Sequence, residues 1–146
     1  MNISIVSFSE LSTKQLYEIL ELRSAIFVVE QECIYQDVDG KDENALHVLG
    51  IIENEIIAYA RILKPGDYFD NFGIGRVLVK KNRRKSNFGQ LIMKATIDHI
   101  QSIDKKAIIE LSAQTYLTNF YKNLGFAVKG EEYLEDGISH IKMTLT

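Results

Sequence analysis

Hydrophobic and polar positions alternate along the chain with two different periods, and these periods predict strands and helices. Residues 3–8 follow a two-residue period, which is typical of a short strand. Ser12 and Gln15 have the spacing of a capping box, and apolar residues then recur at helical spacing as far as Phe27. Because the helical pattern weakens near Ser24, we expect two helical pieces in this segment.

The middle of the chain predicts a loop, a hairpin and a further strand. Residues 34–44 are polar and acidic and predict a loop. Two apolar runs, residues 46–52 and 56–63, flank a short polar turn and predict an antiparallel hairpin. Residues 72–79 predict another strand, and a basic loop of residues 80–85 follows it.

The last third of the chain predicts two helices and three strands. A long helix follows the basic loop, and residues 107–113, 126–134 and 138–145 predict strands around a short helix that ends at Gly125. The apolar stripe of the long helix is expected at Phe88, Leu91, Ile92, Ala95, His99 and Ile103. The predicted order is β, α, α, β, β, β, α, β, α, β, β, which indicates an α/β (α+β) fold: a mixed sheet with helices on both faces.

Composition narrows the class of protein. The 146 residues suit one domain, residues 1–146, and the net charge of −3 does not favour nucleic acid as a partner. With one cysteine, Cys33, the chain forms no internal disulfide and no cysteine-based metal site. It shows neither a secretory signal nor an apolar run long enough to span a membrane, so we expect a cytoplasmic protein without a membrane partner.

The junction between the strand of residues 72–79 and the long helix is the first candidate for chemistry. A helix start offers unpaired N–H groups and the positive end of the helix dipole, which together bind phosphate. Arg84 and Lys85 add positive charge, and Gly89 lets a ligand approach the backbone. The alternative is an ordinary basic loop before a helix.

Two segments resemble the GNAT superfamily of acyl-CoA-dependent N-acyltransferases. Residues 79–89 resemble its motif A, whose pyrophosphate loop reads [QR]-x-x-G-x-[GA]; Arg84, Asn87 and Gly89 stand at the three defined positions. Asn87 replaces a glycine, and asparagine tolerates positive φ better than most residues. Residues 113–126 resemble motif B with its Tyr-x-x-x-Gly-Phe core. Residues 27–31, 35–40 and 135–140 resemble the ElaA-like branch.

The resemblance implies a GNAT-like, mostly antiparallel mixed sheet and direct acetyl transfer from acetyl-CoA to an amine in a ternary complex. The acceptor would be a small molecule or a peptide, and no metal is implied. A homodimer is left open. The cofactor-binding residues expected from the resemblance are Val77, Leu78, Val79, Arg84, Lys85, Ser86, Asn87, Phe88, Gly89, Gln114 and Asn119.

The catalytic roles are argued from the chemistry of thioester aminolysis. The attack places negative charge on the carbonyl oxygen, which a backbone N–H near Val79 can receive. The departing thiolate needs a proton, and the resemblance implies Tyr121 as the general acid. Without the resemblance, a tyrosine on a helix stripe is more often a core residue.

The sequence does not decide which group is the base that removes the proton from the amine. The candidates are Glu110, His140, His47 and Glu30, and a water relay is an equal alternative. The acidic loop around Asp37, Asp39, Asp42 and Glu43 lacks the spacing of a calcium loop. It predicts either turn chemistry on a solvated face or a negative rim that attracts a cationic amine.

Two other functions compete with the enzyme. The same fold can bind acyl-CoA or a protein partner without turnover. A basic-loop RNA-associated protein is the second alternative, and the negative net charge disfavours it.

Overall fold

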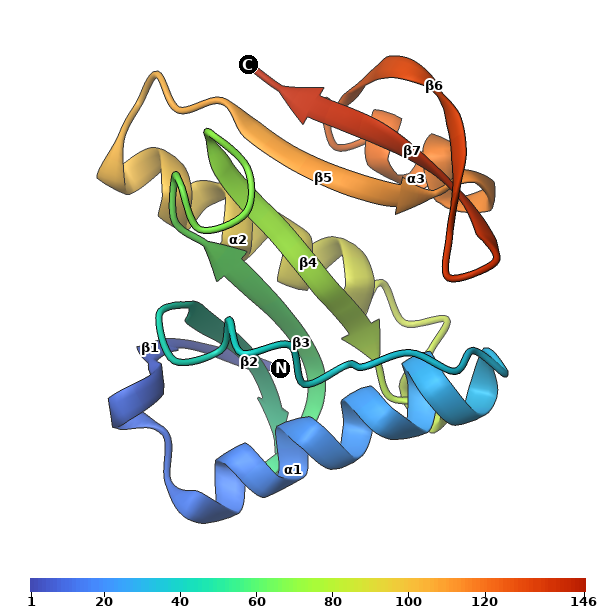
Figure 1. Cartoon of the computed structure of the whole chain (residues 1–146). Coiled ribbons are helices and arrows are strands. Elements are labelled where there is room, and N and C mark those ends of the chain that lie inside the picture. Colours follow the sequence, from blue (N-terminus) through green and yellow to red (C-terminus); the bar gives the residue numbers. More distant parts are fainter.

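One seven-stranded sheet runs through the protein, whose computed structural model describes residues 1–146 (Figure 1). The strands are β1 (Asn2–Ser7), β2 (Leu46–Ile52), β3 (Glu55–Leu63), β4 (Phe72–Val79), β5 (Ile109–Gln114), β6 (Ala127–Glu135) and β7 (Ile138–Leu145). Their order across the sheet is β1-β2-β3-β4-β5-β7-β6, and all neighbours are antiparallel except β4 and β5. The prediction of a mixed, mostly antiparallel sheet is therefore confirmed.

Helices cover both faces of this sheet, as predicted. They are α1 (Thr13–Arg23), the π-helical segment η2 (Ser24–Glu30), α2 (Phe88–Ile103) and α3 (Thr118–Lys122), with short 3₁₀ turns η1 (Phe8–Glu10), η3 (Lys81–Arg83) and η4 (Thr115–Leu117). The capping box that begins α1 is present, because the Ser12 hydroxyl accepts the N–H of Gln15 at 3.0 Å and the Gln15 side chain accepts the N–H of Ser12 at 3.0 Å. The predicted break near Ser24 is the point where α-helix changes to π-helix. Figure 1 shows α1 on one face and α2 with α3 on the other.

Two separate apolar cores follow from this arrangement. Neighbouring residues of a strand point to opposite faces. Val48 accordingly packs in the core beneath α2, whereas the next residue, Leu49, packs in the core beneath α1. Ile57 and Ile56 divide in the same way. The central strands are therefore hydrophobic on both faces, which explains their nearly continuous apolar runs.

The buried face of α2 differs from the predicted stripe. The residues that α2 buries are Ile92, Met93, Thr96, Ile97 and Ile100. Leu91 and Ile103, expected in the stripe, are about half exposed, at 47% and 54%. The hydroxyl of Thr96 donates to the carbonyl of Ile92 at 2.7 Å, so this polar side chain is buried with its hydrogen bond satisfied. The helix has apolar residues around most of its circumference. The periodicity therefore placed Ile92 correctly but chose Leu91 and Ile103 where the structure buries Met93, Ile97 and Ile100.

The outer strand β6 is interrupted in its middle. Lys129 lies opposite Lys142 of β7, but the next paired residue of β6 is Tyr133, opposite His140. Residues 130–132 of β6 thus lie opposite the single residue Ile141 of β7, and Gly130 adopts a positive φ of 79° at this bulge.

Candidate active site

A wedge between β4 and β5 forms the base of the candidate site. These parallel strands pair only at Phe72–Ile109 and Gly73–Glu110, and they separate beyond that point. The N–H of Lys80 donates to Ile57 of β3 at 2.7 Å. Since successive residues of an antiparallel pair alternate in direction, the N–H and C=O of Val79 point away from β3 and into the wedge. The Val79 carbonyl accepts from Arg84, so this edge of β4 offers the N–H of Val79 to an extended ligand.

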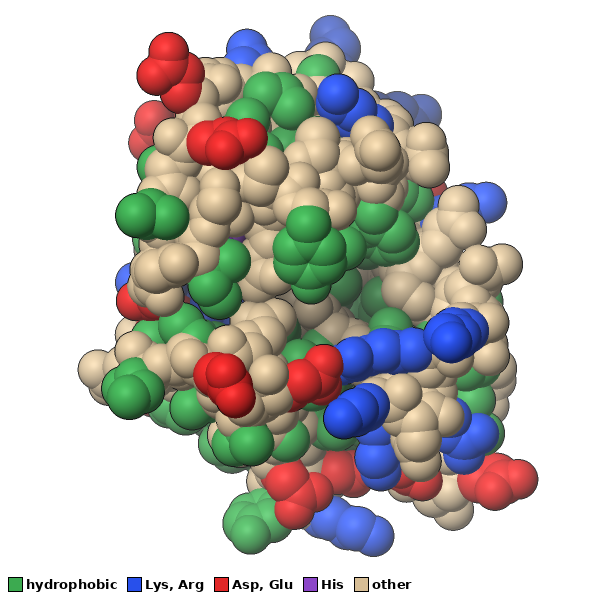
Figure 2. Space-filling view, turned by 90° about the vertical axis from the view of Figure 1, so that its right-hand side faces the viewer, with side chains coloured by type: hydrophobic (Ala, Val, Ile, Leu, Met, Phe, Trp, Pro, Cys, Tyr) green, Lys and Arg blue, Asp and Glu red, His purple; other side chains and the backbone are tan.

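A cavity of about 950 Å³ occupies this wedge. Of the predicted cofactor-binding residues, those that line it are Val77, Leu78, Val79, Arg84, Lys85, Asn87, Phe88, Gly89 and Gln114. Ser86 and Asn119 do not line it. Figure 2 shows Lys and Arg side chains gathered beside a hollow that hydrophobic side chains border. The structure thus brings most of the predicted residues to one cavity.

The start of α2 forms one end of the cavity. Asn87 is its N-cap residue and has φ 61° and ψ 16°, the left-handed conformation expected of it. Its side chain makes no capping hydrogen bond, so the first amide groups of the helix have no side-chain partner. A methyl group at Gly89 would meet Phe120 at an ordinary contact distance of 3.6 Å. Internal packing therefore does not require this glycine, which leaves space beside the helix start.

Arg84 is held by partners inside the protein. Its Nε donates to the carbonyl of Val79 at 3.1 Å, and its two terminal nitrogens donate to the Glu30 carboxylate at 2.7 and 3.0 Å. The ion pair lowers the pKa of Glu30. Glu30 is thus an ionised partner of Arg84 and a weak candidate for the base. The pair links the end of η2 to the end of β4 across the cavity.

Tyr121 of α3 lines the cavity and is largely buried between aromatic rings. Phe120 and Phe126 meet its ring edge-on, with ring centroids at 5.1 and 6.1 Å. Burial, together with a smaller effect of the nearby Tyr116, raises the pKa of Tyr121 to about 12. No hydrogen bond contributes to this shift. The hydroxyl is therefore protonated at neutral pH and available to a ligand.

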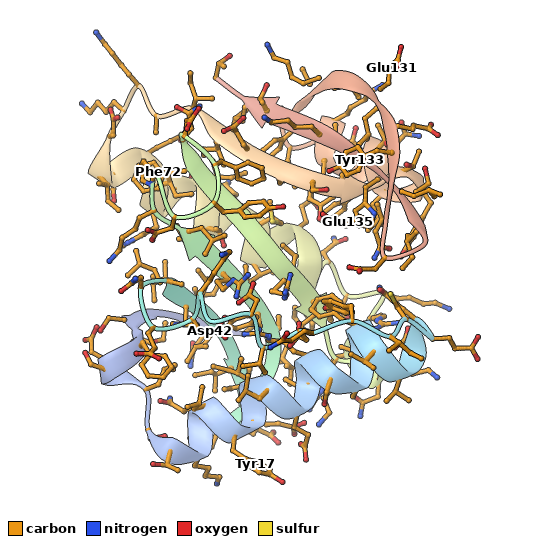
Figure 3. The ribbon with its side chains drawn as sticks, in the orientation of Figure 1. Tyr17, Asp42, Phe72, Glu131, Tyr133 and Glu135 are labelled. Atoms are coloured by element: carbon orange, nitrogen blue, oxygen red, sulfur yellow. The ribbon has the colours of Figure 1, made fainter.

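His140 of β7 also lines the cavity, opposite Gln114 in the register of the sheet. Its Nδ1 donates to the carbonyl of Ile138 at 2.8 Å. A carbonyl oxygen only accepts, so Nδ1 carries the proton of the neutral ring and Nε2 has a free lone pair. The Glu135 carboxylate lies 3.5 Å from Nε2, and the ring stacks on Tyr133. Figure 3 shows Tyr133 and Glu135 on the β6 side of the sheet.

Comparison with known proteins agrees with this geometry. A family model described as an acetyltransferase (GNAT) domain matches residues 11–146. Protein ElaA of Escherichia coli K12 is 46% identical over 137 residues, which cover 92% of this chain and 90% of that protein. The chain belongs to the GNAT acetyltransferase family. The expected likeness to its ElaA-like branch is confirmed.

Solved structures place this GNAT chain among the acyl-CoA N-acyltransferase folds. The crystal structure of E. coli ElaA has a TM-score of 0.93 at 42% identity, with 99% of both chains covered. An acyl-CoA N-acyltransferase from Pseudomonas aeruginosa also scores 0.93, at 33% identity and the same coverage. An aminoglycoside 6′-N-acetyltransferase complexed with coenzyme A shares the fold, with a TM-score of 0.73 at 15% identity and coverage of 99% and 96%.

Two candidate bases lie outside the cavity of this GNAT protein. Glu110 accepts from Lys142 at 2.8 Å and from Asn71 at 3.3 Å. Burial alone would raise the pKa of Glu110, but these partners outweigh it and lower the pKa. His47 is buried, with its ring nitrogens 2.7 Å from the Tyr59 hydroxyl and 2.9 Å from the carbonyl of Asp42. Neither side chain lines the cavity.

The acidic loop is neutralised by arginines that the sequence analysis did not assign. Arg23 of α1, buried to 1% exposure, donates to Asp37 at 2.8 Å and to Asp42 at 2.7 Å. Arg61 of β3 donates to the same Asp42 at 2.9 Å. Figure 3 shows Asp42 on the loop between α1 and the sheet. The one feature of the sequence that pointed to these buried arginines was a charged residue within an apolar pattern, such as Arg23 in the apolar stripe of α1.

The third arginine of this network sits in a bulge. Between the Arg61–Gly75 and Tyr59–Leu78 pairs, β4 has one residue more than β3. Arg76, in this bulge, has a φ of 54°. Its guanidinium lies 2.8 Å from Asp37 and 5.4 Å from the centre of the Tyr35 ring. The three aspartates are therefore balanced by three arginines, so they do not form the free negative rim considered from the sequence.

No group of three or more His, Cys, Asp and Glu side chains is arranged to hold a metal ion. None of the helices has both the length and the apolar character needed to cross a bilayer.

Proposed function

We propose that this protein transfers an acetyl group from acetyl-CoA to the amine of a small molecule or peptide. One observation carries the proposal: the free edge of β4 and the uncapped start of α2 meet in a single cavity. The strand edge suits the amide groups of a pantetheine arm, and the helix start suits a pyrophosphate. The coenzyme A held by a neighbour of the same fold supports this choice of donor.

The backbone and the cations would hold the donor. Lys85 and the amides at the start of α2 receive the phosphates, and Arg84 adds charge if it exchanges Glu30 for phosphate oxygens. The N–H of Val79 points into the wedge, where it can receive the negative charge that develops on the carbonyl oxygen. Removal of such a donor typically costs about 10²- to 10³-fold in rate.

Two side chains would move the protons. The amine nitrogen bonds to the carbonyl carbon and the carbon–sulfur bond breaks, so the sulfur leaves with the electron pair. Tyr121 gives its proton to that sulfur and recovers one from solvent. His140 accepts the proton of the amine at Nε2, and Glu135 stabilises the resulting imidazolium. Glu110, also a candidate from the sequence, lies outside the cavity and receives no role.

Calorimetry with two ligands tests the donor site. Arg84→Ala should weaken acetyl-CoA binding by about tenfold, whereas the affinity for pantetheine, which lacks the phosphates, should stay unchanged. Arg83→Ala is the matched control, because it removes the same charge from the same loop outside the cavity. Equal losses for both ligands would refute the phosphate site.

Release of free thiol from acetyl-CoA in the presence of an amine panel tests turnover. Acceptor-dependent release is expected. The alternative function is a module that binds acyl-CoA, or a protein partner, without catalysis. Tight acetyl-CoA binding without release by any amine would favour that module over the enzyme.

A further inference from the structure

The cavity extends beyond the expected position of the thioester to a second region. There it is lined by the loop before β2, the loop between β3 and β4, and the β6–β7 hairpin. The side chains that matter are Tyr35, Lys41, Tyr68, Phe69, Glu135 and His140. Gly73 is needed here, because a Cβ would lie 2.7 Å from the ring of Phe69. The backbone of β4 thus makes room for an aromatic side chain at the cavity wall.

Lys41 is the cation of this region that has no carboxylate partner. The aspartates on either side of it in the chain are taken by arginines. Asp42 is bound by Arg23 at 2.7 Å and by Arg61 at 2.9 Å. Asp39 is bound by Arg61 at 2.8 Å and by Arg76 at 3.3 Å. The ammonium of Lys41 lies instead over the ring of Tyr68, 5.8 Å from its centre. A half-buried ammonium without a counter-ion at a cavity wall is an available partner for an anionic group of a ligand.

The hairpin supplies the opposite charge. Glu135 and Asp136 line the same region, and Glu135 is paired with nothing but the ring of His140. The thiol of Cys33 donates to the carbonyl of Asp136 at 3.2 Å, which fastens the hairpin turn to the segment that follows η2. A cationic amine is therefore attracted to the side of the cavity where His140 can take its proton.

Two charged groups of opposite sign thus lie on the wall of one cavity. The ammonium of Lys41 lies over the ring of Tyr68, and Glu135 lines the same cavity from the hairpin. A single ligand that carries both a cation and an anion can therefore contact both groups.

We propose that the acceptor is a small amine that also carries an anionic group, and that Lys41 binds this group. The inference rests on the proposed acetyl transfer. Amino acids, with a carboxylate, and amino-alcohol phosphates share this chemistry. Polyamines and lysine side chains lack the anion, and the unpaired charge of Lys41 would repel their additional cations. The aromatic rings of Tyr68 and Phe69 would pack against the carbon skeleton.

Matched pairs of acceptors test the proposal. Each amino acid is compared with its amide, and phosphoethanolamine with ethanolamine, by the rate of thiol release from acetyl-CoA. The anionic member of at least one pair should have the lower KM. In Lys41→Met that KM should rise by about 10- to 100-fold, while the KM of the neutral member and kcat barely change. Which pair responds distinguishes a carboxylate from a phosphate.

Two variants control for structure. Lys64→Met removes an exposed cation outside the cavity and should leave both KM values unchanged. Lys41→Arg keeps the charge and should restore most of the affinity. The proposal is overturned if polyamines or amides are acetylated as well as the anionic amines, or if no anionic amine is acetylated while acetyl-CoA binds. Failure to bind acetyl-CoA at all would instead refute the proposed function.

Discussion

At the scale of single residues, Tyr121 allows a clear test, because the proposed chemical role of its hydroxyl can be separated from the packing of its ring. Its ring is held between Phe120 and Phe126, whereas the shift of its pKa involves no hydrogen bond. The ring therefore contributes to the core and the hydroxyl is free for chemistry. Substitution by phenylalanine keeps the first contribution and removes the second.

We predict that Tyr121→Phe lowers turnover by about 10- to 10³-fold, because the thiolate loses its proton donor. The melting temperature and the affinity for acetyl-CoA should barely move. The measurement is thiol release with the best amine of the panel, together with thermal unfolding. Tyr17→Phe, on the outer side of α1 (Figure 3), is the control. Full turnover in Tyr121→Phe would show that water or another group protonates the sulfur.

The residue scale is also where the sequence predicted least. Glu110 and His140 were both candidates for the base from the sequence, and the sheet places both on the same face of adjacent strands. Their difference arises from partners that are distant in sequence: Lys142 and Asn71 occupy Glu110, whereas Nε2 of His140 has only Glu135 nearby. No local pattern records such contacts.

At the scale of elements, the junction of β4 and α2 depends on the conformation of Asn87. Its φ of 61° is accessible to glycine and asparagine but strained for a β-branched side chain. We predict that Asn87→Gly leaves acetyl-CoA affinity unchanged or tighter. Asn87→Val should weaken it by about tenfold or more, from about 1–3 kcal/mol of strain.

The affinity is measured by calorimetry, and Asn82→Val is the control. Asn82 is an exposed asparagine of the same loop without a positive φ. Its replacement should have no effect on binding. If Asn87→Gly and Asn87→Val bound acetyl-CoA equally, the left-handed conformation at Asn87 would have no part in binding.

The helices, strands and turns were predicted best from the sequence, because the residue types of a turn are visible in a few neighbouring positions. Asp136 and Gly137 have φ values of 51° and 80° between β6 and β7, the pattern of a tight hairpin turn that their types predicted. The stripe predicted for α2 was wrong at Leu91 and Ile103 for a related reason. Leu91 and Ile103 are as hydrophobic as Ile92, so only the position of the sheet decides which of them is buried.

At the scale of the whole molecule, the network of Arg23, Arg61 and Arg76 ties α1, the acidic loop, β3 and β4 together. Burial alone would raise the pKa of Asp39, but Arg61 and Arg76 outweigh it and lower the pKa to about 2. The folded pKa is thus below the ordinary value of 3.8. The contribution of Asp39 to stability is present above that value and is lost as the pH falls towards 2.

We predict that the free energy of unfolding falls less steeply with acid in Asp39→Asn than in the wild-type protein. The difference between the two proteins should shrink by about 2 kcal/mol as the pH falls from about 5 to about 2. Urea unfolding at a series of pH values measures it. Glu43→Gln, an exposed residue of the same loop, should follow the wild-type curve. Parallel curves for Asp39→Asn and wild type would contradict the ion-pair interpretation.

The interruption of β6 affects how copies of the protein can meet. An uninterrupted outer strand of nine residues would be a ready template for a strand of another chain, the usual beginning of sheet-based aggregation. The bulge at Gly130 divides β6 into two short stretches and twists the edge between them. A strand of a second copy can therefore not form a continuous row of backbone hydrogen bonds along β6. Copies that meet at high concentration are thus less prone to stack into fibres through this edge.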